Sequence, residues 1–445
     1  MTSEPQLSNY VRFNEERCTG CAACLRVCPT KAIRIRHHRS IRIVAQCIGC
    51  GACIQACPAG AVSAATRRPE HIGDDHVAVA LVSHVLYAQD PGAMPGGVLT
   101  GLRQMGFHHT IDMSFFLEMF QWATDEFIRR NRVSRVSPWP LISPICPVVV
   151  RLIAFRFPGL LTHVLPVLRP VALMTREVQE QILPAYAETG RKVTLYYINP
   201  CPTLAEQPPD QPAAPPLGCR AAIGINEIYP ELKRRIETVI ASDRIPFSET
   251  HFEFETCSTA NAALGAISGG EIANLDVEKS LAVHGMEETI SYLHKIEMGL
   301  LKDVEYIEFR TCREGCIGGV LTAVDKYVAK RTVQKMVNVF GLGSRLPRES
   351  IRHQYDKGRF QPDKSPMVLT HLFGTRISAL SLGELERIER TLDVIEGRDC
   401  GACGAPDCRT LAEDIIRGKA SLDDCIWLQA RRAEKKILSP ETGDD

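Results

Sequence analysis

Cysteines are the residues whose number and spacing point most directly to chemistry in this sequence. The chain holds 18 of them among 445 residues, and 16 of these fall into three groups: residues 18–57, 146–316 and 400–425. The N-terminal stretch MTSEPQLSNYVRFNEERC lacks the apolar core of a signal peptide, so we expect a cytoplasmic protein with reduced thiols. Grouped thiolates in such a protein favour metal ligation over disulfides.

The first group contains one spacing twice. Residues 18–29 read CTGCAACLRVCP and residues 47–58 read CIGCGACIQACP, and both fit C-x2-C-x2-C-x3-C-P. In this pattern the fourth cysteine of each run ligates the other cluster. It therefore predicts two [4Fe–4S] clusters, one held by Cys18, Cys21, Cys24 and Cys57 and the other by Cys47, Cys50, Cys53 and Cys28. Zinc is the alternative, which two complete copies disfavour, and residues 10–66 resemble the two-cluster ferredoxins.

The last group has the spacing C-x2-C-x4-C-x16-C, over Cys400, Cys403, Cys408 and Cys425. The segment RTLAEDIIRG predicts a helix that ends near Gly418, after which the chain can return so that its last cysteine closes the site. Four thiolates suit a zinc ion or a [4Fe–4S] cubane. The segment resembles a small four-cysteine [4Fe–4S] module of multi-cluster redox proteins, and we favour the cluster.

The middle cysteines lie between predicted strands and helices. HVAVALVSHV, KVTLYYINP and VEYIEFRTC are typical of short buried strands, whereas GGVLTGLRQMGF and EETISYLHKIEMGLL have helical patterns. Their alternation predicts a mainly parallel α/β core, in which loops at strand ends can converge on one pocket. Polar residues around 345–365 look like an exposed connection. By themselves, a Cys-x3-Cys pair and two lone cysteines are a weak signal, and Cys219 and Cys257 are interpreted as inert thiols.

Composition excludes several classes of protein. The 52 basic and 52 acidic residues balance, which argues against a binder of nucleic acid that relies on a basic surface. The most apolar stretch, residues 141–174, contains Arg151, Arg156 and Arg169, so we expect a buried core and no membrane span. No Walker motif is present, and no G-x-G-x-x-G follows a strand, so we expect no nucleotide on this chain itself.

Three middle segments, SPICPVVVRLI, INPCPTLAEQ and EFRTCREGCIGGVLT, together resemble the active-site domain of [FeFe]-hydrogenases. That family has the signatures T-S-C-C-P, P-C-x-x-K-x-x-E and A-C-x-G-G-C-x-x-G-G. With the flanking cluster segments the resemblance covers nearly the whole chain, and the order is similar to that of sensory [FeFe]-hydrogenases. It implies that Cys146, Cys201, Cys312 and Cys316 bind a [4Fe–4S] cubane. In active relatives the position of Cys316 also bridges to a diiron centre that carries CO and cyanide.

The departures from the signatures lie mainly on the diiron side. Ile145 stands where active relatives have a proton-donating cysteine, and an aliphatic side chain cannot transfer protons. Leu204 replaces the lysine that holds a cyanide ligand, and Asn199 and Arg310 stand where methionine is common. Arg310 or Arg313 could substitute for the missing cation, but we expect a cubane without a diiron subcluster.

We therefore predict an iron–sulfur electron-transfer subunit of a larger oxidoreductase complex, with four [4Fe–4S] clusters and no catalytic residues of its own for hydrogen chemistry. The expected α/β fold has a two-cluster ferredoxin domain of α+β type (1–70), a central [FeFe]-hydrogenase-like α/β domain (71–375) and a small helical C-terminal iron–sulfur domain (376–445). Several clusters without a substrate pocket imply redox partners, so we expect a hetero-oligomer with a flavin- or NAD(P)-binding subunit.

Three alternatives remain open from the sequence. The chain could be a hydrogenase that retains the diiron site, which CO and cyanide infrared bands or hydrogen uptake would establish. It could be a redox or hydrogen sensor that acts through a separate signalling protein. A role in iron–sulfur assembly, as in eukaryotic hydrogenase-like proteins, is the weakest of the three, because the chain carries two flanking cluster segments.

Overall fold

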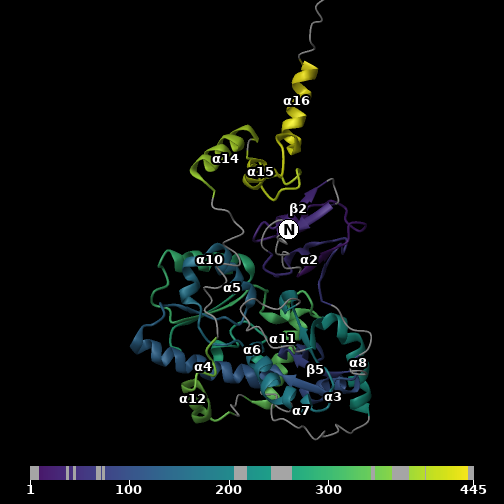
Figure 1. Cartoon of the computed structure of the whole chain (residues 1–445), viewed down its shortest axis with the longest axis vertical. Coiled ribbons are helices and arrows are strands. Elements are labelled where there is room, and N and C mark those ends of the chain that lie inside the picture. The colour runs from purple at the N-terminus through teal and green to yellow at the C-terminus, as the bar shows by residue number, and fades with distance from the viewer. Residues whose placement is uncertain are drawn as a thin grey trace, which may run out of the picture. The chain divides into compact units, whose positions relative to one another are not determined.

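The computed structural model describes residues 10–36, 40–43, 47–66, 72, 76–204, 218–241, 263–341, 346–362, 380–395 and 397–438 (Figure 1). The chain divides into two compact units. The first comprises Met1–Cys47, Ala52–Ala64 and Gly374–Asp445, and the second comprises Ile48–Gly51 and Ala65–Phe373. The expected boundaries between three domains stay a prediction.

The N-terminal part of the first unit is built from two antiparallel strand pairs and two short helices. Strand β1 (Val11–Phe13) pairs with β4 (Val62–Ala64), and β2 (Ile33–Arg36) pairs with β3 (Ser40–Ile43). The second pair lies between the two cysteine runs. Helices α1 (Ala23–Arg26) and α2 (Ala52–Ala56) carry a cysteine each, and their buried side chains join the strands in a small core.

The C-terminal part of the first unit is helical, as predicted. It contains α14 (Leu382–Ile395), α15 (Cys408–Ile416) and α16 (Ile426–Leu438). Asp407 caps α15 by accepting a hydrogen bond from the backbone N–H of Thr410 at 2.7 Å. Gly418 follows with φ +68°, the left-handed conformation that lets the chain turn back after a helix.

A buried ion pair joins these two parts of the first unit. Arg34 in β2 donates from Nε and Nη2 to the Asp414 carboxylate of α15, at 2.6 and 3.2 Å, and both side chains are under 10% exposed. Lys31 and Asp407 form a second ion pair beside it. The backbone N–H of Ile35 donates to the carbonyl of Gly404 at 3.0 Å. The last cysteine group and the first, apart from Cys50, therefore belong to one packed body.

The second unit contains two parallel sheets, which confirms the α/β class. One has the order β6-β5-β8-β9 and the other β10-β11-β7, and every pairing is parallel. The strands are β5 (Val77–Val82), β6 (His109–Asp112), β7 (Leu141–Ile142), β8 (Val193–Asn199), β9 (Gly218–Gly224), β10 (Ser280–His284) and β11 (Tyr306–Arg310). β5, β8 and β11 coincide with the three predicted strands.

Helices cover both faces of the larger sheet, so its strands are apolar on both sides. Val77, Val79 and Leu81 of β5 face a core shared with α4 (Met113–Ser134) and α6 (Pro170–Glu177). The alternate residues of β5 face a core shared with α3 (Pro95–Gln104), α8 (Ile225–Ala241) and α11 (Lys326–Phe340). This alternation fits the two-residue period of a strand.

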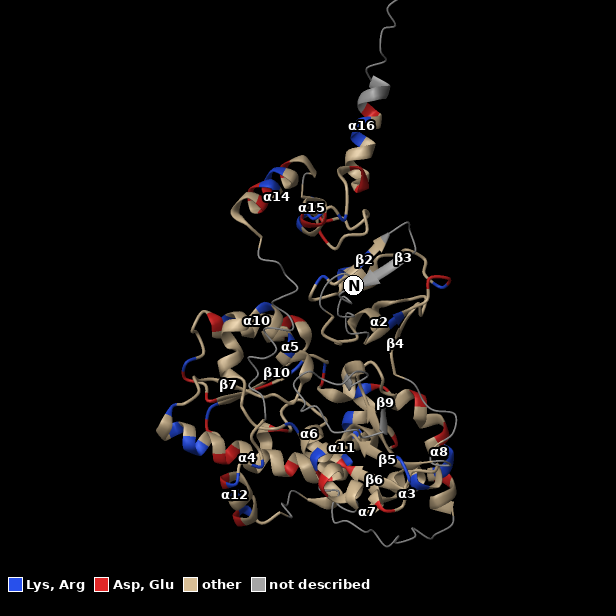
Figure 2. Ribbon diagram, viewed as in Figure 1, with Lys and Arg blue, Asp and Glu red and all other residues tan. Residues whose placement is uncertain are grey.

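The smaller sheet packs against α5 (Pro147–Arg156) and α10 (Met286–Glu297). The remaining helices of the unit include α7 (Leu183–Ala187) and α12 (Arg348–Asp356). The expected exposed connection at 345–365 is wrong in part, because α12 lies there and both Ile351 and Phe360 are buried in the core. Both basic and acidic residues occur on α4, α8 and α14 (Figure 2). No helix in the described part of the chain has the length and apolarity needed to cross a membrane.

Candidate metal centres

The cysteines predicted to hold the first cluster lie close together in the first unit. Burial, and then repulsion from Cys18, Cys57 and Cys21, raises the pKa of Cys24 to about 11. Cys57 thus joins the three cysteines of the other run, as the ferredoxin spacing requires. Thiolates held this close repel one another, and they become ligands once a metal neutralises their negative charge.

Backbone N–H groups donate to cysteine sulfurs of both predicted ferredoxin clusters. Gly20 donates to Cys18 Sγ at 3.4 Å, Ala32 to Cys28 Sγ at 3.3 Å and Ala61 to Cys57 Sγ at 3.2 Å. Hydrogen bonds to cluster sulfurs are one of the means by which proteins set reduction potentials.

Two further cysteine sets follow the predicted grouping to different degrees. Cys28, Cys47 and Cys53 pack in the core of the first unit, whereas Cys50 belongs to the second unit. At the C-terminal site, burial and then repulsion from Cys400, Cys425 and Cys408 raise the pKa of Cys403. Asp399 binds this loop in both directions: its N–H donates to Cys408 Sγ at 3.2 Å, and its carboxylate accepts from the Cys408 N–H at 2.7 Å.

The four middle cysteines line one cavity of about 110 Å³ in the second unit, together with Cys50. Cys146 precedes α5, Cys201 follows β8, and Cys312 and Cys316 follow β11. These are the strand-end loops from which convergence was expected. Burial, and then repulsion from Cys316, Cys146 and Cys201, raises the pKa of Cys312 well above its usual value.

The described residues contain no group of three or more His, Cys, Asp and Glu side chains arranged to hold a single metal ion. Cys219 lies in β9, and Cys257 lies outside the described residues.

The other side chains around the middle cavity are mostly apolar. Ile145 lines it directly beside Cys146, with Pro147, Val148, Pro170 and Val171. Leu204, the residue in the place of the family lysine, ends the short η4 helix (Pro202–Leu204). Of the two arginines considered as a substitute cation, Arg313 is exposed, whereas Arg310 is 1% exposed and lines the cavity.

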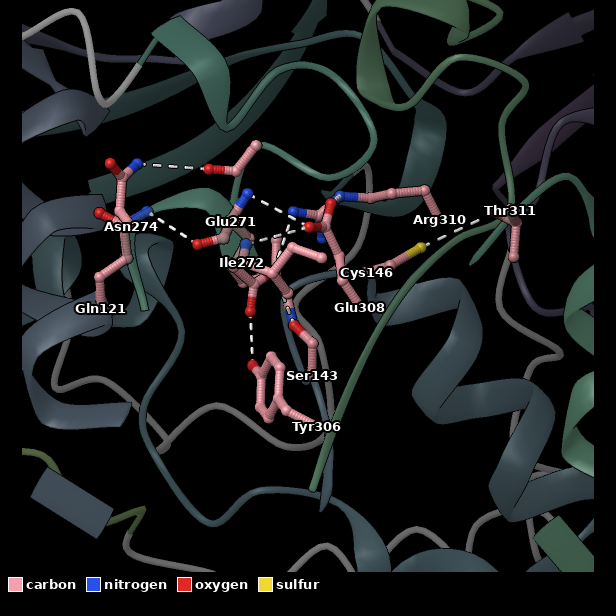
Figure 3. A network of polar contacts seen from close by, with 12 residues as sticks. Gln121, Ser143, Cys146, Glu271, Ile272, Asn274, Tyr306, Glu308, Arg310 and Thr311 are labelled. Carbon is pink, nitrogen blue, oxygen red and sulfur yellow. Dashed lines mark hydrogen bonds and ion pairs between the residues drawn. The ribbon is translucent and has the colours of Figure 1, made fainter. Parts of the chain in front are cut away.

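Arg310 belongs to a buried polar network that the sequence analysis missed (Figure 3). Its Nη2 donates to Glu271 Oε2 at 3.0 Å, and its Nε lies 3.3 Å from Glu308 Oε1. Tyr306 and Ser143 also donate from their hydroxyls to the Glu271 carboxylate. Both carboxylates are fully buried. Burial raises the pKa of Glu308 to about 7 although Arg310 acts in the opposite direction.

A signal for half of this network was present in the sequence. Glu308 and Arg310 are charged residues two apart in the otherwise apolar strand VEYIEFRTC, and buried charges need partners. Glu271 precedes Glu308 by 37 residues, so its part in the network follows only from the tertiary fold.

The Tyr306→Phe variant should be destabilised by roughly 1.5–3 kcal/mol, the usual contribution of a hydrogen bond to a charged group. The loss follows because the fully buried Glu271 side chain would have one hydrogen-bond donor fewer. Chemical unfolding of the anaerobic protein measures it. Phe360→Tyr, at a buried site outside the network, tests whether a hydroxyl change in any core position has the same effect. An unchanged unfolding midpoint for Tyr306→Phe would show that the network does not stabilise the fold.

Comparisons with known proteins match three parts of the chain. A 4Fe-4S dicluster domain matches residues 10–58, the iron only hydrogenase large subunit, C-terminal domain, matches residues 76–203, and an Fe-S cluster family matches residues 396–426. Over 177 residues the chain is 36% identical to the periplasmic [Fe] hydrogenase large subunit of Nitratidesulfovibrio vulgaris. That match spans 36% of this chain and 42% of the relative.

Solved structures of the [FeFe]-hydrogenase from Chlamydomonas reinhardtii are also similar. One variant has a TM-score of 0.46 at 14% identity, over 68% of this chain and 95% of that one. An apo variant has a TM-score of 0.47 at 15% identity, over 69% and 95%.

The dicluster, hydrogenase and Fe-S matches follow one another in the order predicted from the cysteine groups. The chain is thus an iron–sulfur protein similar to the large subunits of [FeFe]-hydrogenases.

Proposed function

We propose that this chain is an electron-transfer subunit of a larger cytoplasmic oxidoreductase complex, and that it relays electrons through four [4Fe–4S] clusters. One observation carries the proposal: four cysteines suited to a cubane line the middle cavity, while Ile145 occupies the place of the proton donor. Such clusters, when bound, supply one-electron redox chemistry at potentials that the protein tunes. The relay needs ligands, but it needs no proton donor.

The residues around the middle cavity suit a cubane. Cys201 Sγ lies 3.1 Å from Thr203 Oγ1, and Cys146 Sγ lies 3.8 Å from Thr311 Oγ1, so hydroxyls stand beside two of the four sulfurs. The apolar lining around them limits water and lowers the local dielectric, which is a further means of setting the potential.

The same residues do not fit a diiron unit with CO and cyanide ligands. Such a unit is anionic and is stabilised by nearby cations and hydrogen-bond donors. Arg310 is the buried arginine that could replace the missing lysine, and it is already paired with Glu271 and Glu308. Leu204 stands in the place of the family lysine and Ile145 in the place of the proton donor, so the sequence supplies neither at these two positions.

Anaerobic purification of the native complex tests the proposal. We expect about 16 iron atoms per chain, since four cubanes hold four each, and no infrared bands from CO or cyanide. The variant Cys201→Ser serves as the control, with an expected fall to about 12 iron atoms. About 18 iron atoms together with CO bands would contradict the relay.

The partner in this proposal is a flavin- or NAD(P)-binding subunit in a hetero-oligomer. Its support is that the sequence has no nucleotide motif of its own, so that a two-electron donor would have to bind elsewhere. Co-purification of a flavin-containing subunit, with electron transfer from NAD(P)H into the clusters, is the expected result. A native chain that purifies alone would oppose this part of the proposal.

A second candidate is a hydrogenase that binds the diiron unit. The 36% identity to a hydrogenase large subunit favours it. Expression with the maturation machinery of [FeFe]-hydrogenases distinguishes the two candidates, because only this one predicts hydrogen uptake and CO bands in the matured protein.

A further inference from the structure

Several buried polar atoms of residues that line the middle cavity have no hydrogen-bond partner among the described residues. They include Arg310 Nη1, Asn199 Nδ2 and the ring nitrogens of His84, and all three residues line the cavity with the four cysteines. Arg310 is 1% exposed and Asn199 is 5% exposed, so water from the surface does not reach them freely. Buried donors without a partner are costly, which indicates that an acceptor belongs in front of them.

The acceptor expected in this cavity is a cluster with its sulfur ligands. The charges of Cys316 and Cys146 act on Arg310, and Arg310 in turn acts on Cys316, so the guanidinium lies within electrostatic reach of these thiols. Sulfides and thiolates both accept hydrogen bonds from N–H groups, and such bonds shift cluster potentials.

The placement of the ion pair decides whether the arginine or the carboxylates lie nearer to a cluster in the cavity. Arg310 lines the cavity, whereas Glu271 and Glu308 are absent from its described lining. Of these three charged residues, Arg310 alone is part of the cavity lining, and the two carboxylates pair with its guanidinium (Figure 3). Of the three, the positively charged Arg310 would lie nearest to a cluster in the cavity.

We propose that Arg310 is a positioning residue that raises the reduction potential of the middle cluster, with Asn199 as a second donor. The proposal rests on the relay function, because it requires a cubane in the cavity. Burial by itself makes reduction harder, since the added electron brings negative charge into a region of low dielectric. A fixed cation offsets this cost, and an arginine keeps its charge at every relevant pH.

The test is an anaerobic potentiometric titration of the full chain, followed by electron paramagnetic resonance. The main variant combines Arg310→Met with Glu271→Gln, so that only one of the two buried carboxylates, Glu308, is left without its cation. At a fixed ambient potential its ratio of reduced to oxidised middle cluster should fall at least tenfold, which corresponds to about 59 mV for one electron.

Three further variants make the result specific. Arg310→Lys keeps the charge and should stay near the wild-type potential. Arg313→Met removes the same charge from an exposed side chain beside Cys312, and we expect little change because solvent screens it. Asn199→Leu removes one hydrogen-bond donor but keeps a side chain of similar size. It should lower the reduction potential of the middle cluster by less than the double variant does.

Unchanged middle-cluster potentials in both the double variant and Asn199→Leu would overturn the proposal. If the double variant loses the middle cluster, the potential measured for Asn199→Leu alone tests the proposal, since this variant leaves the ion pair intact. Failure of the relay function would look different, because wild-type protein would then show CO bands or lack the middle cubane before any substitution.

Discussion

The Gly319→Ala variant is expected to lose the middle cluster and to keep the other three. A Cβ at this position would lie 2.4 Å from the carbonyl oxygen of Pro200 and 3.0 Å from that of Cys316. Neither oxygen can move freely, because Pro200 precedes Cys201, and Cys316 accepts a hydrogen bond from the N–H of Gly319 at 3.0 Å. The substitution therefore pushes apart two of the loops that carry the four ligands.

We expect the iron content of Gly319→Ala to fall from about 16 to about 12 atoms per chain. A matched control is Gly159→Ala, where a Cβ would meet nothing within 4 Å, and its iron content should equal that of the wild type. Gly318→Ala, whose Cβ would lie 2.1 Å from the Arg313 carbonyl oxygen, should behave like Gly319→Ala. A full iron content in both variants would mean that the ligand loops are less constrained than their contacts indicate.

The Arg34→Leu variant should destabilise the first unit by about 3–5 kcal/mol, the usual cost of leaving one member of a buried ion pair behind. The Asp414 carboxylate, at 8% side-chain exposure, would lose both of its hydrogen bonds from the guanidinium. The carbonyl groups of Lys31 and Ile33 would lose a donor as well.

Thermal unfolding of the anaerobic protein, with release of the C-terminal cluster as a second readout, measures this effect. The double variant of Arg34→Leu with Asp414→Leu should recover most of the loss, because neither charge remains to be desolvated. Lys31→Leu is the control: its side chain is 54% exposed, and we expect no more than about 1 kcal/mol. Equal effects of Arg34→Leu and Lys31→Leu would show that burial of the pair is unimportant.

Local patterns explain why much of the fold could be predicted. β5, β8 and β11 lie within apolar runs recognised in the sequence, and α3, α10 and α15 lie in the predicted helical segments. The N-terminal and C-terminal cysteine sets were predicted from spacing, because a cubane imposes short fixed intervals on its ligands, whereas the middle set was implied by the family resemblance. The segment around Ile351 was misjudged, since its few apolar residues are spaced among many charges and polarity alone indicated exposure.

The interactions that could not be predicted join residues far apart along the chain. Arg34 and Asp414 are separated by 380 positions, and neither lies in a motif that names its partner. The pairing of Arg310 with Glu271 likewise depends on how the loop before β10 packs on β11. Arg310 could be noticed as an unusual residue, but its two carboxylates made its role visible only in three dimensions.

The Arg34–Asp414 pair also imposes an order on biosynthesis. A ribosome adds about 5–20 residues each second, so roughly 20–75 s pass between the synthesis of Arg34 and that of its partner 380 positions later. During this interval the first eight cysteines are already made, while the helix that packs beside them does not yet exist. Nascent chains should therefore present these thiols to oxidants and to the cluster-loading machinery before the unit closes, and slow translation of the middle segment would prolong that exposure.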